Sequence, residues 1–131
     1  MIKEITLIVA ALYGGLAIIL GAFGAHALKK IFTPEQIASF ETGVKYQMYH
    51  AIVLLIIGTQ LPLVNSLEVV MVWLFIIGTL LFSFSIYGLC ISSAKGNKIK
   101  ILGPITPLGG LLLVAGWVCL LIYFISYGKF I

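Results

Sequence analysis

The chain has 131 residues, of which 62% are apolar and 9% are charged, and eight Lys against four Glu give it a net charge of +4. This composition excludes a soluble domain, because long windows of the sequence contain no charge that could form a hydrated surface. The lysines lie in short segments between apolar runs and not on a basic face with exposed aromatics, which argues against a nucleic-acid partner. The sequence therefore predicts a membrane protein whose main partner is the lipid bilayer.

The first membrane span is predicted over residues 5–28. This window of about 24 residues holds no charge, and about 20 are needed to cross a hydrocarbon core of about 30 Å. Residues 25–27 resemble a signal-peptidase site, but the apolar run is longer than a signal core, so we expect a retained helix. Small side chains recur on one stripe of this helix, which predicts close helix packing. The stripe consists of Gly14, Ala17, Gly21 and Gly24.

A helix start is predicted at residues 33–36, which read Thr-Pro-Glu-Gln and can form a capping box with proline in the first turn. Apolar and polar residues fall on different faces of the helix that follows. We therefore expect a short amphipathic helix over 33–43 on the cytoplasmic membrane surface, with a bend at Gly43. Glu41 and Lys45 are four residues apart and are expected to form a surface ion pair.

The second span is informative because its uninterrupted apolar run is too short to cross a membrane. Counting back about 20 residues from Leu63 places this span at 44–63 and brings Gln47 and His50 inside it. The two polar residues are three apart and share one helical face. An unsatisfied amide or imidazole is costly in hydrocarbon, so we expect this face to point toward neighbouring helices.

Two further spans are predicted over residues 67–92 and 106–127. The fold class expected for the single domain is therefore an all-α antiparallel bundle of four transmembrane helices. Six lysines fall on one side of this topology and two on the other. The positive-inside rule then places loops 29–45 and 94–105 in the cytoplasm and both termini outside the plasma membrane.

The polar residues near the cytoplasmic ends of the spans form the candidate site. His26 ends the first span and His50 begins the second on the same side, so we expect the two imidazoles to lie close together. A pocket around them would bind or transport a lipid or a small polar ligand. Its candidate residues are His26, Tyr46, Gln47, His50, Tyr87 and Thr106. A buried hydrogen-bond network that only fixes helix packing is the alternative interpretation.

Other chemistry finds less support in the sequence. A metal site needs three or four converging ligands, and Glu41 is expected on a different face from the two histidines. A haem between the histidines is disfavoured by their different expected depths, and serine-type catalysis lacks an Asp. We therefore predict no catalytic residue, no metal and no cofactor, and we do not expect an enzyme. A structural protein that forms homo-oligomers through the small-residue stripe is the remaining alternative.

Three long motifs resemble a known family. They are Gly-Ala-Phe-Gly-Ala-His-Ala-Leu at 21–28, Thr-Gly-Val-Lys-Tyr-Gln-Met-Tyr-His-Ala at 42–51, and Ile-Thr-Pro-Leu-Gly-Gly at 105–110 followed by Gly116-Trp117. These motifs resemble the bacterial membrane family called domain of unknown function 423, to which transmembrane protein 256 of animals is similar. The resemblance implies a four-helix integral protein of the bacterial plasma membrane with no assigned activity, and it makes both histidines motif positions.

Overall fold

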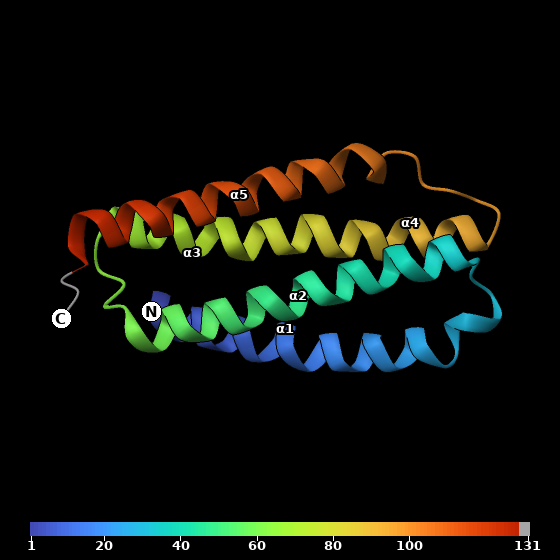
Figure 1. Ribbon diagram of the computed structural model, residues 1–131, viewed down its shortest axis with the longest axis horizontal. Helices are drawn as coiled ribbons and strands as arrows, with labels where there is room; N and C mark the ends of the chain where they lie inside the picture. Colours follow the sequence, from blue (N-terminus) through green and yellow to red (C-terminus); the bar gives the residue numbers. More distant parts are fainter. Residues whose placement is uncertain (129–131) are drawn as a thin grey trace.

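The computed structural model describes residues 1–128, and all the regular secondary structure in this part of the chain is helical. The prediction of an all-α fold is confirmed. Figure 1 shows long helical rods lying lengthwise beside one another, with α3, η2 and α4 following each other in one rod. The elements are α1 (Ile2–Ala25), the 3-10 turn η1 (Leu28–Lys30), α2 (Pro34–Gln60), α3 (Ser66–Thr79), the π-helical segment η2 (Leu80–Phe84), α4 (Ser85–Ala94) and α5 (Leu102–Tyr127).

Three helical stretches are long and apolar enough to cross a membrane. They are Ile2–Lys30, Ser66–Ala94 and Leu102–Tyr127. The helix α2 has 27 residues and would measure about 40 Å at 1.5 Å per residue, so its length also suffices. Its composition is more polar because it carries charged and amide side chains along its first half.

The start of α2 follows the sequence prediction. The Thr33 hydroxyl accepts a hydrogen bond from the Gln36 backbone N–H at 3.2 Å, and the Gln36 side-chain oxygen accepts one from the Thr33 N–H at 2.9 Å. These two bonds satisfy amide groups that the first helical turn leaves without an intrahelical partner. The capping box therefore defines where the chain turns into α2.

The continuity of α2 corrects the prediction of a surface helix over 33–43 followed by a separate span over 44–63. No break occurs in the helix, and Phe40, in the segment expected on the surface, is 1% exposed. Gly43 does not bend the chain. It lets another helix approach, because a methyl group added there would lie 2.8 Å from a ring carbon of Tyr87. The first turns of α2 thus pack against other helices of the chain.

The small-residue stripe of α1 packs against α2. A methyl group added at Gly24 would come within 3.1 Å of the Phe40 ring, and one added at Gly14 would touch the Cβ of Ala51 at 3.9 Å. Between these positions Ala17 is 1% exposed. Helix association in lipid depends on such close backbone approach, because acyl chains are as apolar as the side chains and the hydrophobic effect does not drive helices together. The stripe is therefore covered within the chain.

The helix α5 packs on α3 and η2 in a similar way. A methyl group at Gly116 would lie 2.8 Å from the Phe75 ring, and one at Gly109 would overlap the backbone of Leu81 and Phe82. The molecule thus consists of two closely packed pairs, α1 with α2 and α3–α4 with α5, and α2 rests on the rod formed by α3, η2 and α4. The helices α2 and α5 do not pack closely against each other, which leaves a groove between them.

The two ends of the molecule differ in what they carry. The connection from α1 to α2 and that from α4 to α5 lie together at one end, and the beginning of α1 and the end of α5 lie at the other (Figure 1). Lysines cluster in the two connections, at positions Lys29, Lys30, Lys95, Lys98 and Lys100.

Candidate functional site

Gln47 is fully buried where α1, α2 and α4 meet. Its amide nitrogen donates to the backbone oxygen of Tyr13 at 2.8 Å, and its amide oxygen accepts from the Tyr87 hydroxyl at 2.7 Å. The Tyr13 hydroxyl in turn donates to the backbone oxygen of Ile76 on α3 at 2.8 Å. A satisfied network of this kind fixes how helices pack. Gln47 and Tyr87 were both predicted to line a ligand pocket, and in the structure they form a hydrogen bond with each other in this network.

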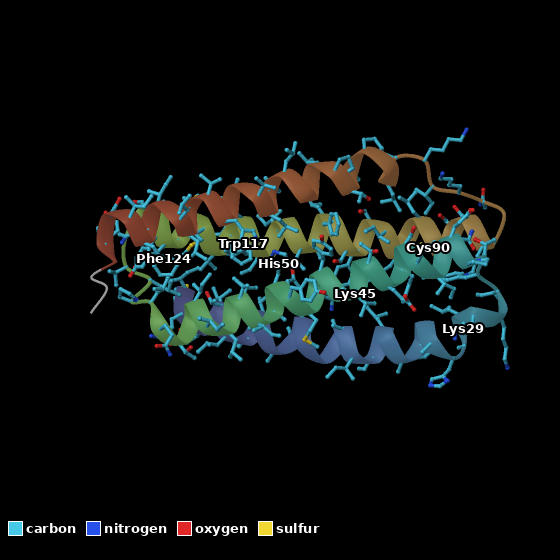
Figure 2. All side chains as sticks on the ribbon, in the orientation of Figure 1. Lys29, Lys45, His50, Cys90, Trp117 and Phe124 are labelled. Atoms are coloured by element: carbon cyan, nitrogen blue, oxygen red, sulfur yellow. The ribbon has the colours of Figure 1, made fainter. Side chains whose placement is uncertain are left out.

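His50 lies one turn further along α2 and is 4% exposed. Its Nδ1 atom is 2.7 Å from the backbone oxygen of Tyr46, and its Nε2 atom accepts a hydrogen bond from the Trp117 indole N–H at 3.1 Å. A carbonyl can only accept and an indole N–H can only donate, so this arrangement assigns the proton to Nδ1 of a neutral imidazole. Figure 2 labels His50 and Trp117 next to each other in the region between α2 and α5.

His26 does not join His50, which corrects the expectation that the two imidazoles meet. It is the exposed C-cap residue of α1. Because Gly14 faces Ala51, His50 lies level with the middle of α1, about eleven residues or roughly 16 Å along the helix axis from His26. The physical reason is the early start of α2, which places His50 in the middle of a long helix and not at its end.

Tyr46 and Thr106 contribute to the surface between α2 and α5. Tyr46 is 42% exposed, and its ring packs on Phe82 with a centroid distance of 5.1 Å. The Thr106 hydroxyl lies 2.6 Å from the Ser85 hydroxyl and thereby joins α5 to α4. The five predicted residues other than His26 thus lie on α2, α4 and α5 but in three separate hydrogen-bonded groups: Gln47 with Tyr87, His50 with Tyr46, and Thr106 with Ser85.

The ion pair expected between Glu41 and Lys45 does not form. Both side chains are exposed, and in residues 1–128 the ion pair within 4.0 Å joins the Met1 amino group to Glu4, at 3.0 Å. Exposed pairs four residues apart gain little because water solvates each charge well by itself.

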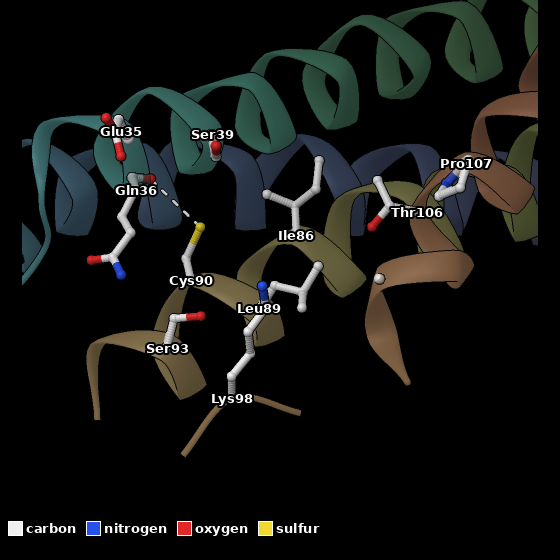
Figure 3. A pocket seen from close by; sticks show the side chains of 11 residues that line it. Glu35, Gln36, Ser39, Ile86, Leu89, Cys90, Ser93, Lys98, Thr106 and Pro107 are labelled. Atoms are coloured by element: carbon white, nitrogen blue, oxygen red, sulfur yellow. Dashed lines mark hydrogen bonds between the residues drawn. The ribbon is translucent and has the colours of Figure 1, made fainter. Parts of the chain in front are cut away.

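Three hollows follow one another along the seam between α2 and α5, and we call them together the α2–α5 groove. The polar hollow, of about 400 Å³, lies at the end with the lysine-rich connections (Figure 3). The central hollow, of about 580 Å³, contains His50 and Trp117, and the apolar hollow, of about 410 Å³, continues to the other end. Neighbouring hollows share residues, Pro107 between the first two and Trp117 between the last two. The three hollows together therefore border nearly the whole length of α2.

The polar hollow differs from the rest of the groove in its side chains. It is lined by Glu35 and Ser39 of α2, Ser93 of α4 and Lys98 of the connection, above an apolar floor. The central and apolar hollows present aliphatic and aromatic side chains along most of their walls. The groove thus changes from polar to apolar along its length.

The described residues contain no group of three His, Cys, Asp or Glu side chains placed to hold a metal ion. Cys90 is buried, with its thiol 3.5 Å from the backbone oxygen of Gln36, and Cys119 is half-buried. The separation of His26 from His50 is also too large for both to ligate one haem iron.

Tyr13 and Trp117 were not predicted as site residues, although both complete its hydrogen bonds. The sequence feature that could have indicated them is their position along the apolar segments. Tyrosine and tryptophan in membrane proteins usually occupy the interfaces, whereas these two fall in the middle of apolar spans. Such a position indicates that the hydroxyl or indole N–H has a buried partner.

Comparison with known proteins identifies the family. A family model described as "Protein of unknown function (DUF423)" matches residues 20–110. A UPF0382 membrane protein of Staphylococcus haemolyticus is 39% identical and covers 91% of this chain and 93% of its own. One of Schizosaccharomyces pombe is 37% identical, with 87% and 96% covered, and one of Bacillus subtilis is 34% identical, with 95% and 98% covered. No solved structure matches the chain.

These relatives are all named as membrane proteins, in agreement with the apolar helices of the structure. The resemblance indicated by the three motifs is confirmed, since the matched residues 20–110 include the first two motifs and most of the third. The chain is therefore a membrane protein of the DUF423 family.

Proposed function

We propose that the chain crosses the membrane four times and binds a lipid in the α2–α5 groove. Three rods are apolar enough to span by composition, and α2 supplies the fourth crossing. Its polar residues Gln47 and His50 are turned inward and satisfied by other helices, while exposed Ile52, Leu55 and Ile56 face outward. A helix with this distribution is compatible with lipid although its average composition is not strongly apolar.

The orientation follows from the charges at the two ends. The connections that join α1 to α2 and α4 to α5 hold five of the eight lysines. The positive-inside rule places these connections in the cytoplasm and the termini outside. The polar hollow then opens at the cytoplasmic interface, where lipid headgroups lie.

The observation that carries the proposal is the polar-to-apolar gradient along the three neighbouring hollows. From Ser39 at the polar hollow to His50 at the centre, α2 advances eleven residues, or about 16 Å. One leaflet contributes about half of a hydrocarbon core of about 30 Å. A headgroup in the polar hollow would therefore place its acyl chain in the central hollow and end it near the His50–Trp117 bond.

The hydrogen bonds of His50 favour an acyl chain over a small polar solute in the central hollow. Both imidazole nitrogens are already bonded, one to Tyr46 and one to Trp117. The ring therefore offers its apolar faces, and not a free donor or acceptor, to a molecule in the groove. Apart from Thr42 and Tyr46, the rest of this hollow is apolar and includes Phe82 and Val114.

The small-residue stripe is not exposed, which argues against the alternative of oligomers formed through it. The stripe faces α2 within the same chain, and Ala17 at its centre is 1% exposed. A second copy could reach these residues only by displacing α2.

The proposal is tested by filling the central hollow. In Val114→Trp the new indole would occupy the space of the acyl chain, and in the control Leu108→Trp the same residue is added to an exposed position of α5 outside the groove. Native mass spectrometry of the protein in mild detergent, titrated with a defined phospholipid, counts one-to-one lipid adducts. We expect several-fold fewer adducts for Val114→Trp only. Equal adducts for the two variants, or none for the unmodified protein, would refute lipid binding in the groove.

A further inference from the structure

We propose that the polar hollow selects a zwitterionic phospholipid with a primary amine, that is, a phosphatidylethanolamine headgroup. This inference rests on the proposed binding of a lipid in the α2–α5 groove and names the class of lipid. It is carried by the charges and hydrogen-bonding groups that line the hollow.

Two opposite charges face the polar hollow without meeting. Glu35 lies on the first turn of α2 and Lys98 on the connection between α4 and α5, and both line the hollow. Neither side chain has an ion-pair or hydrogen-bond partner in residues 1–128, although both are exposed and within reach of the same space. Figure 3 shows the Lys98 amine extending toward Leu89 from below, with Glu35 on the α2 side. Two unpaired charges on opposite walls suit a ligand that carries both signs.

The neutral groups of the hollow add hydrogen-bonding capacity beside these charges. The hydroxyls of Ser39 and Ser93 line the hollow and make no hydrogen bond within the described part of the chain. A phosphate offers only acceptor oxygens, whereas a primary ammonium offers three donors. Lys98 and the serine hydroxyls can therefore donate to a phosphate, and the Glu35 carboxylate can accept from an ammonium.

The size and the floor of the hollow fit the rest of a phospholipid. Its volume of about 400 Å³ lies within the range of small-molecule sites, which is about 300–1,000 Å³. Ile86, Leu89 and Pro107 form an apolar floor, and Pro107 also borders the central hollow. A headgroup bound between Glu35 and Lys98 would thus lead directly into the space proposed for the acyl chain.

Other headgroups satisfy these residues less well. A phosphatidylglycerol headgroup has no ammonium for Glu35 and brings its negative charge near that carboxylate. A phosphatidylcholine headgroup carries a quaternary ammonium, which cannot donate a hydrogen bond to Glu35. The lysine-rich connections would by themselves favour an anionic lipid. A preference for phosphatidylethanolamine would therefore indicate a specific contribution of the Glu35 carboxylate to binding.

The test is a competition among phosphatidylethanolamine, phosphatidylcholine and phosphatidylglycerol with identical acyl chains, read by native mass spectrometry of the full chain. We expect the unmodified protein to prefer phosphatidylethanolamine by about threefold, the scale of an exposed ion pair. Glu35→Gln should lose this preference without losing total adducts, and Lys98→Gln should lower the adducts of all three lipids. Glu41→Gln and Lys100→Gln, which change exposed charges outside the hollow, should leave the preference intact.

The outcomes separate this inference from the proposed function. Binding without headgroup preference, a preference for phosphatidylglycerol, or an unchanged preference in Glu35→Gln would overturn the headgroup assignment and leave groove binding standing. An absence of lipid adducts, or equal adducts in Val114→Trp and Leu108→Trp, would overturn the groove itself. Thermal unfolding of each variant in detergent confirms that the compared proteins are folded.

Discussion

Replacement of Gln47 by leucine tests whether the buried amide holds the helices together. Leucine has nearly the same volume, so the change removes hydrogen bonds with little change in packing. Two bonds are lost, from the Gln47 nitrogen to the Tyr13 backbone oxygen and from the Tyr87 hydroxyl to the Gln47 oxygen. The Tyr13 carbonyl belongs to α1 and retains its intrahelical bond, but the Tyr87 hydroxyl loses its Gln47 partner in a buried position.

The expected loss can be worked from these contacts. Hydrogen bonds between membrane helices contribute about 0.6 kcal/mol on average and up to about 1.7 kcal/mol. The buried Tyr87 hydroxyl loses Gln47 but keeps the Ser83 side chain as a partner, so its cost lies at the low end of the range of about 1–3 kcal/mol for an unsatisfied buried group. We therefore expect Gln47→Leu to lower the free energy of unfolding by about 2 kcal/mol. Tyr87→Phe removes the same bond from its other side, so the double variant should lose about 1 kcal/mol less than the sum of the single variants.

Unfolding in mixed micelles titrated with sodium dodecyl sulfate measures these differences. Gln60→Leu is the matched control, because it makes the same replacement on α2 at an exposed position and should change stability little. Strict additivity of Gln47→Leu and Tyr87→Phe, or an equal loss in Gln60→Leu, would refute the assignment of Gln47 as the link between α1, α2 and α4.

Two further variants address the contacts of α2 with its neighbours. Trp117→Phe removes the indole donor to His50 and should lower the free energy of unfolding by about 1 kcal/mol in the same assay. Adding His50→Phe to this variant should lower it little further. An unchanged free energy of unfolding in Trp117→Phe would show that the bond does not join α2 to α5. Gly43→Ala places a methyl group 2.8 Å from a facing aromatic ring and should destabilise by about 1–3 kcal/mol, whereas Gly15→Ala, which meets nothing within 4 Å, should be neutral or slightly stabilising; similar effects at both glycines would contradict the close approach at Gly43.

Much of the architecture follows from local signals that the sequence contains. Long apolar windows place α1, the α3–α4 rod and α5, because the length of such a window reports directly on its ability to cross hydrocarbon. The capping box at Thr33 marks the start of α2, because its hydrogen bonds join residues three apart. The motifs around His26 and His50 indicate the family for the same reason, since they are continuous in the sequence.

The candidate site required the tertiary structure. The bond between His50 and Trp117 joins residues 67 positions apart, and the network around Gln47 joins residues 34 and 40 apart. No local sequence pattern indicates contacts between residues so far apart in the chain. The position of His50 relative to His26 depends on where α2 begins and on the register in which α1 packs against it. Neither could be read from the sequence, and the prediction that His26 and His50 meet was therefore wrong.

The sequence by itself determined the all-helical membrane class, the start of α2 and the polar residues of α2 that needed partners on other helices, because these depend on composition and on neighbours within one or two helical turns. Only the tertiary structure decided that Gly43 is a contact and not a bend, and that α2 and α5 diverge to leave a groove. The reason is that glycine permits both a bend and a close approach, and the choice lies with the residue that another helix brings against it.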